Sequence, residues 1–455
     1  MHSPSNGAIE KMARWLAGLT AEVVPQAVND IARNCLIDTL GVMAAGSVTP
    51  VAAHALALAQ MAGAGGDCRV IGQAAWLDVR QACFVNGVAA HALDFDDNCY
   101  AGFVHGSAVI APAALAMAQH RDASGRDLLT AFIAGAECEY ALGAASDNVL
   151  YGLGWWTTGV LGPVGSCAAA AWLLRLDWRR SANALGLALA GAAGLKACFG
   201  SDAKPFLAGR AAEAGVTAAL MAQLGTSGPH DACEHRNGFV ARFNDGQFAP
   251  AAFDALGQRW SLQQPGIDIK RIPVCLSSHA AVDAVMQLQQ RHDIAVDDIA
   301  SIVCDVPPIV IANLVHDEPL TPQQAQFSMP FAIAASLLHG DLALHHLSAA
   351  TLGEPQLRRL MQRISMTSSA VWDDPRRLAA APEGARVRMT LVDGTTREGV
   401  RDYARGAARE PLADDEIDRK FLACLAAAGL ASSAPAWLAQ WRGLDRQVSA
   451  RALPG

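Results

Sequence analysis

The densest group of side chains suited to chemistry lies in residues 91–107, HALDFDDNCYAGFVHGS. Asp94, Asp96 and Asp97 fall within four residues of one another, and His105 follows. Partly buried carboxyls this close together cannot all ionise freely, so we expect at least one raised pKa. Such a carboxyl beside a histidine can act as an acid/base pair. Two other interpretations stay open: an exposed acidic loop that caps the next helix, and a divalent metal site, although the spacing fits no standard ligand pattern.

A second candidate element is SDAKPFLAGRAAEAG, residues 201–215, at the start of a helix that we predict over 205–224. Pro205 suits a first helical turn, and Gly225 suits a helix C-terminus. Lys204 comes directly before this helix, where free N–H groups and the helix dipole favour an anion. A lysine there needs a carboxylate nearby. An anionic substrate, Asp202 or the acidic loop would each serve.

The third element is DIKRIPVCLSSHAAVDAV, residues 268–285, which holds Lys270, Arg271 and Cys275. It falls where we expect the two parts of the molecule to join. A hinge ion pair with a buried structural thiol is as good an interpretation as a catalytic site. Lysine is scarce: of 35 basic residues, five are lysines, and we expect the remaining Lys11 and Lys420 to lie on the surface.

The elements that must position these residues are mostly helices. Apolar residues recur at helical spacing through the first part of the chain, whereas residues 299–306 and 386–399 indicate strands, the latter a hairpin around Asp393-Gly394. We therefore predict a mostly α protein: a large helical domain from both chain ends (1–265 and 405–455) with a smaller inserted α+β lid (266–404). Predicted helices cover 25–45, 48–63, 76–92, 107–120, 124–143, 164–175, 179–195, 205–224, 279–291, 324–339, 354–362, 413–429 and 435–443.

Composition excludes several classes of protein. The chain has 455 residues, of which 52% are hydrophobic, and its net charge of −8 gives no basic footprint for nucleic acid. Residues 148–174 carry no charged side chain, but their glycines, tryptophans and proline indicate a buried loop leading into a core helix rather than a membrane span. Eleven dispersed cysteines and an N-terminus without signal-peptide character predict a cytoplasmic protein with reduced thiols.

The chain lacks the sequence motifs of several common chemistries. It has no Gly-x-Gly-x-x-Gly after a strand, no phosphate-binding Gly-x-x-x-x-Gly-Lys-Ser/Thr loop, no Gly-x-Ser-x-Gly and no His-Glu-x-x-His. The sequence therefore shows none of the motifs that usually indicate hydride transfer, phosphoryl transfer or zinc-dependent hydrolysis.

Taken in order, these elements resemble the MmgE/PrpD family, whose members dehydrate 2-methylcitrate, decarboxylate cis-aconitate or epimerise iminodisuccinate. The resemblance covers nearly the whole chain. It implies the helical domain and inserted lid reached above, a metal-free site between them, and a homodimer. The matching stretches are DTLGVMAAG (38–46), FVNGVAAHALDFDD (84–97), His105-Gly-Ser, GVLGPVGSCAAAAWLL (159–174), AKPFLAGRAAEAG (203–215), KRIPVCLSSHAAVD (270–283) and FSMPFAIAASLLHGD (327–341).

The resemblance also implies roles for four residues. Asp94, His105, Lys204 and Lys270 match residues that line the active site of the family's decarboxylases. The family's common chemistry is proton transfer at a carbon next to a carboxylate. Asp94 and His105 would be the acid/base groups, and the two lysines would bind carboxylates and stabilise enolate-like charge. Cys275 would line the substrate pocket.

Several positions depart from the family pattern. Asn98 replaces a threonine, Trp156 a histidine, Ile311 a tyrosine and Leu207 a histidine, while Lys196 stands where relatives have an apolar residue. We expect Asn98, Trp156, Lys196 and Ile311 to contact the substrate. The pocket would then have exchanged polar groups for apolar surface, and burying an unpaired carboxylate costs several kcal/mol (~2–7).

The resulting prediction is a cofactor-independent lyase, a dehydratase or decarboxylase, that acts on a small carboxylic acid with an apolar portion. Neither cis-aconitate nor 2-methylcitrate is expected to be the preferred substrate. The alternatives are an epimerase, racemase or isomerase on the same scaffold, and a noncatalytic member that binds a small acid. No nucleic-acid or membrane partner is expected.

Overall fold

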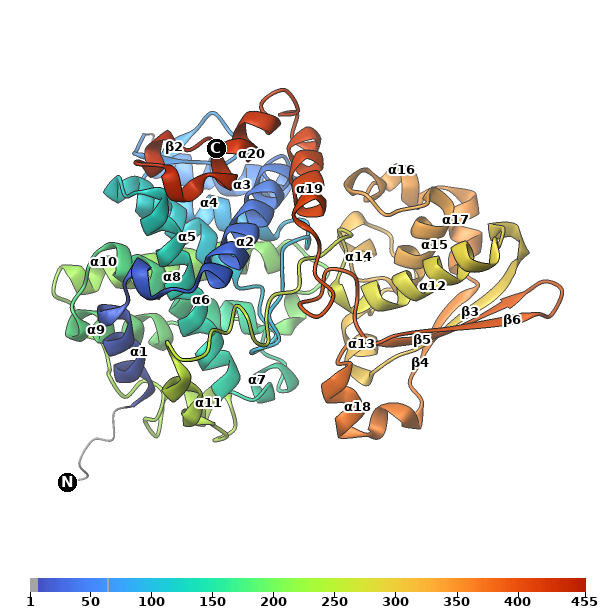
Figure 1. The fold of residues 1–455 in the computed structure, drawn as a ribbon, viewed down its shortest axis with the longest axis horizontal. Helices are drawn as coiled ribbons and strands as arrows, with labels where there is room; N and C mark the ends of the chain where they lie inside the picture. Colours follow the sequence, from blue (N-terminus) through green and yellow to red (C-terminus); the bar gives the residue numbers. More distant parts are fainter. Residues whose placement is uncertain (1–6, 64) are drawn as a thin grey trace.

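The computed structural model describes residues 7–63 and 65–455, and helices make up most of it (Figure 1). A large helical body and a smaller lid that carries a four-stranded sheet stand side by side in this view. The predicted class, mostly α with a smaller α+β part, is confirmed. Residues 1–6, part of the N-terminus in which we predict no signal peptide, lie outside the described residues.

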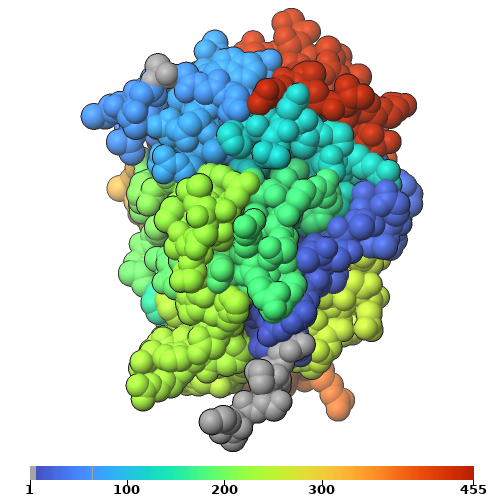
Figure 2. Space-filling view, turned by 90° about the vertical axis from the view of Figure 1, so that its left-hand side faces the viewer, coloured from blue at the N-terminus to red at the C-terminus, as the bar shows by residue number. Residues whose placement is uncertain are grey.

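The helical body is built from both ends of the chain. Its hydrophobic core draws on residues between 8 and 269 and again between 412 and 453. In the space-filling view the C-terminal residues lie directly against segments from the first part of the chain (Figure 2). Its helices are α1 (Ala8–Gly18), α2 (Gln26–Gly46), α3 (Pro50–Met61), α4 (Val79–His91), α5 (Ser107–Arg121), α6 (Gly125–Ala145), α7 (Val149–Gly152), α8 (Thr157–Leu173), α9 (Trp178–Ala190), α10 (Ala203–Gln223), α11 (Phe239–Phe243), α19 (Asp414–Ala427) and α20 (Ala434–Arg442), with two short strands, β1 (Cys68–Arg69) and β2 (Trp76–Leu77).

The lid has its own core, formed by residues between 272 and 389. Its sheet has the order β4-β3-β5-β6, with β3 parallel to β4 and antiparallel to β5. Helix α12 packs on β5 and β6. Its elements are α12 (His279–His292), β3 (Ile299–Asp305), α13 (Pro308–Asn313), α14 (Pro322–Ala325), α15 (Met329–His339), α16 (Ala349–Leu352), α17 (Pro355–Met361), β4 (Ile364–Thr367), α18 (Pro375–Ala380), β5 (Ala385–Leu391) and β6 (Thr396–Arg401).

Several helix boundaries differ from the prediction. The helix predicted over 324–339 is two helices, α14 and α15, and α4 begins at Val79 rather than at residue 76. Helix α8 begins at Thr157 rather than near residue 164 and contains Pro163. Its glycines serve close helix packing instead of a loop: a Cβ on Gly162 would lie 3.0 Å from the Val109 side chain of α5. Helix α10 begins at Ala203, two residues before Pro205, so Lys204 belongs to its first turn.

Among the described helices, α6 is long and apolar enough to cross a membrane, and α2 with α3 would qualify as a bent pair. In α6, 94% of the apolar window is buried inside the protein, as expected of a core helix. The charge-free segment 148–174 forms α7 and the wholly buried α8. All eleven cysteines are free, and ten of them are buried, which agrees with the prediction of reduced thiols.

Candidate active site

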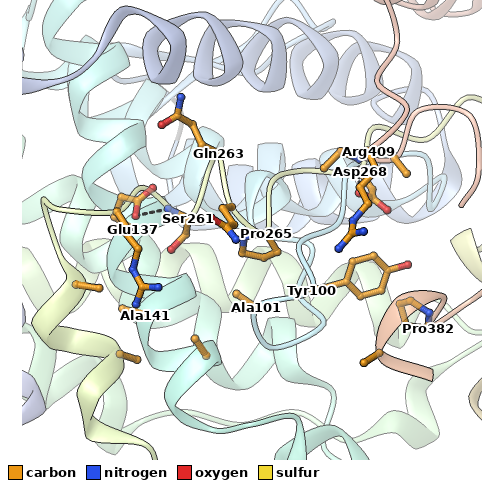
Figure 3. A pocket seen from close by; sticks show the side chains of 18 of the residues that line it. Tyr100, Ala101, Glu137, Ala141, Ser261, Gln263, Pro265, Asp268, Pro382 and Arg409 are labelled. Carbon is orange, nitrogen blue, oxygen red and sulfur yellow. Dashed lines mark hydrogen bonds between the residues drawn. The ribbon is translucent and has the colours of Figure 1, made fainter. Parts of the chain in front are cut away.

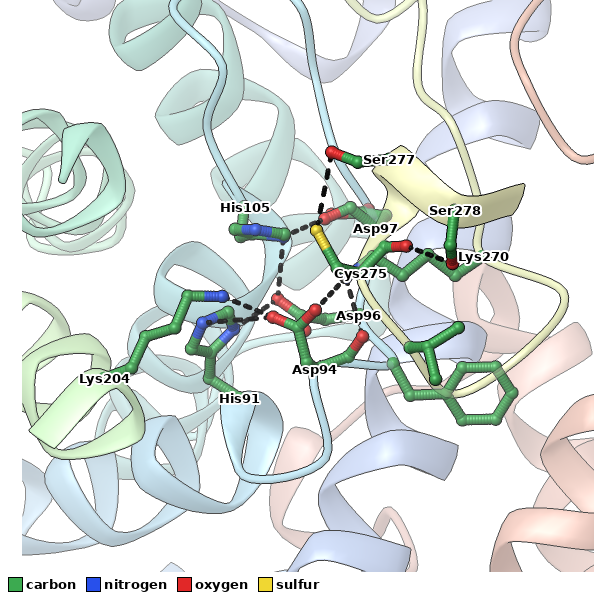
Figure 4. Close-up of polar contacts among 12 residues, drawn as sticks. His91, Asp94, Asp96, Asp97, His105, Lys204, Lys270, Cys275, Ser277 and Ser278 are labelled. Atoms are coloured by element: carbon green, nitrogen blue, oxygen red, sulfur yellow. Dashed lines mark hydrogen bonds and ion pairs between the residues drawn. The ribbon is translucent and has the colours of Figure 1, made fainter. Parts of the chain in front are cut away.

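The centre of the candidate site is Asp94, whose carboxylate receives two lysine ammonium groups (Figure 4). Lys204 Nζ pairs with Oδ1, while Lys270 Nζ lies 3.0 Å from Oδ2 and 2.6 Å from the Asp94 carbonyl oxygen. Burial alone would raise the Asp94 pKa, but the two lysines outweigh it and hold the pKa well below its usual range. Asp94 is therefore ionised, and its two ion pairs connect the acidic loop to helix α10 and to the segment that enters the lid.

The loop between α4 and α5 places its three aspartate carboxylates in the interior of the protein. Asp94, Asp96 and Asp97 are each at most 2% exposed, so the interpretation of an exposed acidic loop is wrong. Asp94 adopts a left-handed conformation with φ of 48°, which is uncommon for a residue other than glycine. The carboxylate that Lys204 needs at its helix start is supplied by this loop rather than by Asp202.

His105 is held as a neutral imidazole. Its Nδ1 lies 2.8 Å from the Asp97 carbonyl oxygen and 3.4 Å from Asp96 Oδ2. Both neighbours are acceptors, so the ring proton resides on Nδ1 and Nε2 keeps its lone pair. Burial is the main cause that lowers the His105 pKa to about 3. The ring is therefore unprotonated at neutral pH.

Asp96 supports two imidazole rings. His91 Nδ1 lies 2.8 Å from Asp96 Oδ2, the oxygen that also faces His105. Burial opposes ionisation of Asp96, but the two histidines outweigh it and hold its pKa well below the ordinary value. A carboxylate at this position stabilises positive charge that develops on His105 when the ring accepts a proton.

Asp97 behaves differently from its two neighbours. Burial raises its pKa to about 7, although its side chain accepts a hydrogen bond from the Ser107 hydroxyl. The prediction that one of the clustered carboxyls has a raised pKa is met at this residue. Its carboxyl points toward Ser107 at the start of α5, whereas its backbone carbonyl fixes His105.

A small cavity of about 40 Å³ opens beside these groups, between the helical body and the lid. His105 and Lys204 line it, together with the predicted contact residues Asn98, Trp156 and Cys275. The Asn98 side-chain nitrogen is buried and has no hydrogen-bond partner among the described residues. It is therefore a free donor at the cavity wall. The remaining lining residues are Phe103, Tyr151, Phe199, Leu276, Asn313, Phe327 and Glu383.

Four predicted site residues do not line this cavity. Asp94, expected as an acid/base group, contacts Lys204 at the cavity but is not itself a lining residue. Lys270 is fully buried behind Asp94 and does not line the cavity. Lys196 lies behind a cavity wall, with Nζ 3.7 Å from the centre of the Tyr151 ring. Ile311 is 38% exposed and lines a separate hollow on the lid, so the expectation that it faces the substrate pocket is not met.

The sequence prediction missed a hydrogen-bonded chain along the lid side of the cavity. The Tyr151 hydroxyl donates to Asn313 Oδ1 at 2.6 Å, and Asn313 Nδ2 donates to Ser277 Oγ at 3.1 Å. The Ser277 hydroxyl in turn donates to Glu383, which also accepts from the Tyr100 hydroxyl at 2.6 Å. The five residues come from five separate segments, so no sequence motif could have identified them.

Lys420, expected on the surface, is buried and connects the C-terminal helix α19 to the site. Its Nζ lies 2.7 Å from Asp38 Oδ1 and donates to the carbonyl oxygens of Phe95 and Lys270, each at 2.8 Å. These carbonyls belong to the residue after Asp94 and to Lys270 itself. Lys420 therefore fixes the two backbone segments that must meet for the Asp94–Lys270 pair to form.

The described residues contain one group with metal-ligand geometry. His91 Nδ1, Asp96 Oδ2 and His105 Nδ1 lie within 4.8 Å of one another. These atoms are engaged in the hydrogen bonds described above, and two ammonium groups stand beside them. Because a ligating imidazole nitrogen must be unprotonated, this arrangement fits a metal poorly. Metal independence stays a prediction.

Family models match most of the chain in order. The MmgE/PrpD N-terminal domain matches residues 10–251, and the MmgE/PrpD C-terminal domain matches residues 272–435. The chain belongs to the MmgE/PrpD family. Within this family it is similar to the cis-aconitate decarboxylase of Homo sapiens, with 28% identity over 91% of this chain and 87% of that protein.

Fungal relatives show the same level of similarity. A cis-aconitate decarboxylase-like protein of Aspergillus oryzae is 27% identical over 92% of this chain and 90% of its own length. The cis-aconitate decarboxylase of Aspergillus terreus is 24% identical over 91% and 89%. MmgE/PrpD membership with relatives of these names supports a lyase-type activity and leaves the substrate open.

Proposed function

We propose that this protein is a cofactor-independent lyase that removes a proton next to a carboxylate of a small carboxylic acid. The observation that carries this proposal is His105, whose Nδ1 is committed to the Asp97 carbonyl oxygen while its ring lines the same cavity as Lys204. A neutral imidazole with a free Nε2 is a base. The ammonium group beside it can stabilise the negative charge that proton removal creates.

In the proposed reaction, His105 Nε2 accepts the proton and the C–H electron pair moves toward the substrate carboxylate. Lys204 stabilises the resulting enolate-like charge, and Asp96 stabilises the imidazolium. The electron pair then expels a hydroxyl from the neighbouring carbon, and His105 returns its proton to that group. Water leaves, the double bond forms, and the imidazole is regenerated.

Asp94 has a positioning role in this scheme. Its carboxylate stays ionised between Lys204 and Lys270, which makes it a poor proton donor at neutral pH. It fixes the ammonium of Lys204 at the cavity wall. Lys270 contributes through Asp94 rather than by touching the substrate.

Decarboxylation is the second candidate, favoured by the names of the relatives. In that reaction carbon dioxide departs first, and the carbanion must then receive a proton. Since the one ring proton of neutral His105 is held on Nδ1 by two acceptors, Nε2 has no proton to give to that carbanion, and the site is better suited to begin as a base. We therefore place dehydration first.

The cavity walls favour an acid with an apolar portion. Phe103, Trp156, Phe199, Leu276 and Phe327 supply most of the surface that is not hydrogen bonding. A further carboxylate against these groups would lose its hydration without gaining a partner, at a cost of about 2–7 kcal/mol. We propose that neither cis-aconitate nor 2-methylcitrate is the preferred substrate, and rapid turnover of either would refute this part.

The activity can be tested with a panel of hydroxy, unsaturated and branched carboxylic acids in deuterium oxide, with products identified by mass spectrometry. Dehydration gives loss of water, and decarboxylation gives loss of carbon dioxide with one deuterium gained. An epimerase would exchange one hydrogen for deuterium and otherwise keep the mass. If no acid in the panel reacts but some bind, the protein is a noncatalytic member and the proposal fails.

A further inference from the structure

A second, larger cavity of about 710 Å³ lies between the helical body and the lid (Figure 3). Tyr100 lines it from the loop after α4, Arg259 from the segment before the lid, and Arg409 from the segment that leads back to α19. In Figure 3, Tyr100, Asp268, Pro382 and Arg409 gather at one end of this cavity. We call it the outer cavity, and the one beside His105 the inner cavity.

A narrow hollow lies between the two cavities and shares lining residues with each of them. Tyr100 lines both this hollow and the outer cavity, whereas Leu276 and Glu383 line both the hollow and the inner cavity. The Tyr100 hydroxyl donates to Glu383 Oε2 at 2.6 Å. Tyr100 belongs to the helical body and Glu383 to the lid, so this hydrogen bond closes the passage between them.

Two arginines give the outer cavity a positive character. Within residues 7–63 and 65–455, neither Arg259 nor Arg409 has a carboxylate at ion-pair distance, and both are exposed. The Arg409 guanidinium lies 5.0 Å from the centre of the Tyr403 ring, which leaves its N–H groups available. Unpaired guanidinium groups in a concave site attract and bind carboxylates.

The acidic residues of the outer cavity do not cancel this charge. Glu137 accepts hydrogen bonds from the backbone N–H groups of Ser261 at 2.8 Å and Leu262 at 3.1 Å. Asp268 accepts from the N–H of Ala408 at 2.7 Å. Burial raises the pKa of each carboxyl to about 7. Both are therefore partly neutral near pH 7 and already occupied by backbone donors.

We propose that the outer cavity is an anion-binding vestibule, from which a small carboxylate reaches the inner cavity when the Tyr100–Glu383 contact opens. Arg259 and Arg409 hold the carboxylate in the vestibule. The class of ligand rests on the proposed function, whereas the route itself does not. The inner cavity, at about 40 Å³, has room for only a few waters, so it must widen to admit a substrate, and opening of the Tyr100–Glu383 contact would widen it.

The route can be tested without knowing the substrate, because Cys275 lines the inner cavity. Two thiol reagents would be compared on the full-length protein: anionic 2-sulfonatoethyl methanethiosulfonate and neutral methyl methanethiosulfonate. Peptide mass spectrometry gives the rate of modification at Cys275 for each. Burial raises the Cys275 pKa to about 11, but this slows both reagents equally and cancels in the ratio of the two rates.

If the outer cavity binds anions on the way to Cys275, removing its arginines should change the ratio of the two modification rates. In Arg259→Gln/Arg409→Gln, the anionic reagent should slow about three- to tenfold relative to the neutral one, at the low end of electrostatic steering effects. The matched control is Arg291→Gln, an exposed arginine at the end of α12 in the lid. It should leave the ratio unchanged. An unchanged ratio in the double variant would overturn the vestibule.

The gate predicts parallel changes for both reagents. Tyr100→Phe removes the hydroxyl that bonds Glu383, so both rates should rise about tenfold, the effect of losing one hydrogen bond to a charged group. Ala407→Leu narrows the hollow, since Ala407 lines it and the outer cavity, and both rates should fall. If Tyr100→Phe changes neither rate, the gate is wrong. Because no turnover is required, these outcomes are independent of whether the protein is a lyase.

Discussion

Replacing Lys420 with methionine tests how the C-terminal helix supports the site. Lys420 and Asp38 are 8% and 1% exposed and pair at 2.7 Å. Removing one partner of a buried ion pair costs about 3–5 kcal/mol, because the other charge stays behind without compensation. We expect Lys420→Met to lower the free energy of unfolding by about that amount. Removing both charges in Asp38→Asn/Lys420→Met should recover part of the loss.

The loss should depend on pH. Burial raises the Asp38 pKa and Lys420 opposes this, so the pKa rises further when the lysine is removed. In the folded variant Asp38 keeps its proton at pH values at which Asp38 is already ionised in the unfolded chain. The free energy of unfolding therefore falls as the pH rises from the Asp38 pKa of the unfolded chain to that of the folded variant. The destabilisation relative to the natural protein should therefore be larger at pH 8 than at pH 5.

The assay is urea unfolding followed by tryptophan fluorescence and circular dichroism. Lys11→Met is the matched control: Lys11 pairs with Asp254 at 2.6 Å, but the two side chains are 29% and 65% exposed. An exposed pair contributes about 0–1 kcal/mol. Lys420→Met should also change the kinetics, because the Phe95 and Lys270 carbonyls lose their hydrogen-bond donor. We expect kcat to fall about tenfold or more with little change in KM. The reasoning is refuted if Lys420→Met is no more destabilising than Lys11→Met and leaves kcat unchanged.

Three other predictions follow from the buried charges. Glu139 has no hydrogen-bond partner among the described residues, and burial raises its pKa to about 8. Glu139→Gln should therefore stabilise the protein more at pH 8 than at pH 5, because ionised Glu139 destabilises the folded state. Urea titrations should show a difference of up to about 4 kcal/mol between the two pH values. Asp94→Asn removes the carboxylate that lies between the Lys204 and Lys270 ammonium groups; it should cost about 3–5 kcal/mol and abolish measurable turnover. Lys196→Met should change kcat/KM less than about threefold, because the half-buried ammonium contacts the Tyr151 ring and does not line the inner cavity; a larger loss would place Lys196 in the substrate path.

Much of the fold could be predicted because local signals were strong. Helical periodicity and capping residues defined α2, α5, α12 and α17 to within a residue or two, and Asp393-Gly394 marked the β5–β6 hairpin. The loop between these strands is four residues long rather than two, with Gly394 at a φ of 84°. The glycines of α8 were misleading because close packing between helices and a flexible turn favour the same residue. Strand β4 was missed because its four residues pair with a distant strand.

The site residues likewise fall into those that local sequence signals predicted and those that depend on tertiary contacts. Asp94, His105 and Lys204 could be identified because a helix start, a cluster of carboxyls and the family pattern agreed on them. The burial of Lys420 and the partners of Glu383 depend on contacts between segments far apart in sequence. Ile311 was misplaced because it lies outside every stretch that matches the family pattern. Family resemblance identified the residue types, but the packing of the lid on the body decides which of them face the cavity.

The central claim is that His105 acts as the base, and the turnover of His105→Gln tests it most directly. With the best acid from the panel, kcat should fall about 10²- to 10⁴-fold, the range for loss of a general base. His54→Gln, an exposed histidine on α3, is the matched control and should leave kcat unchanged. A folded His105→Gln protein that turns over the acid at the rate of the His54→Gln control would contradict the account.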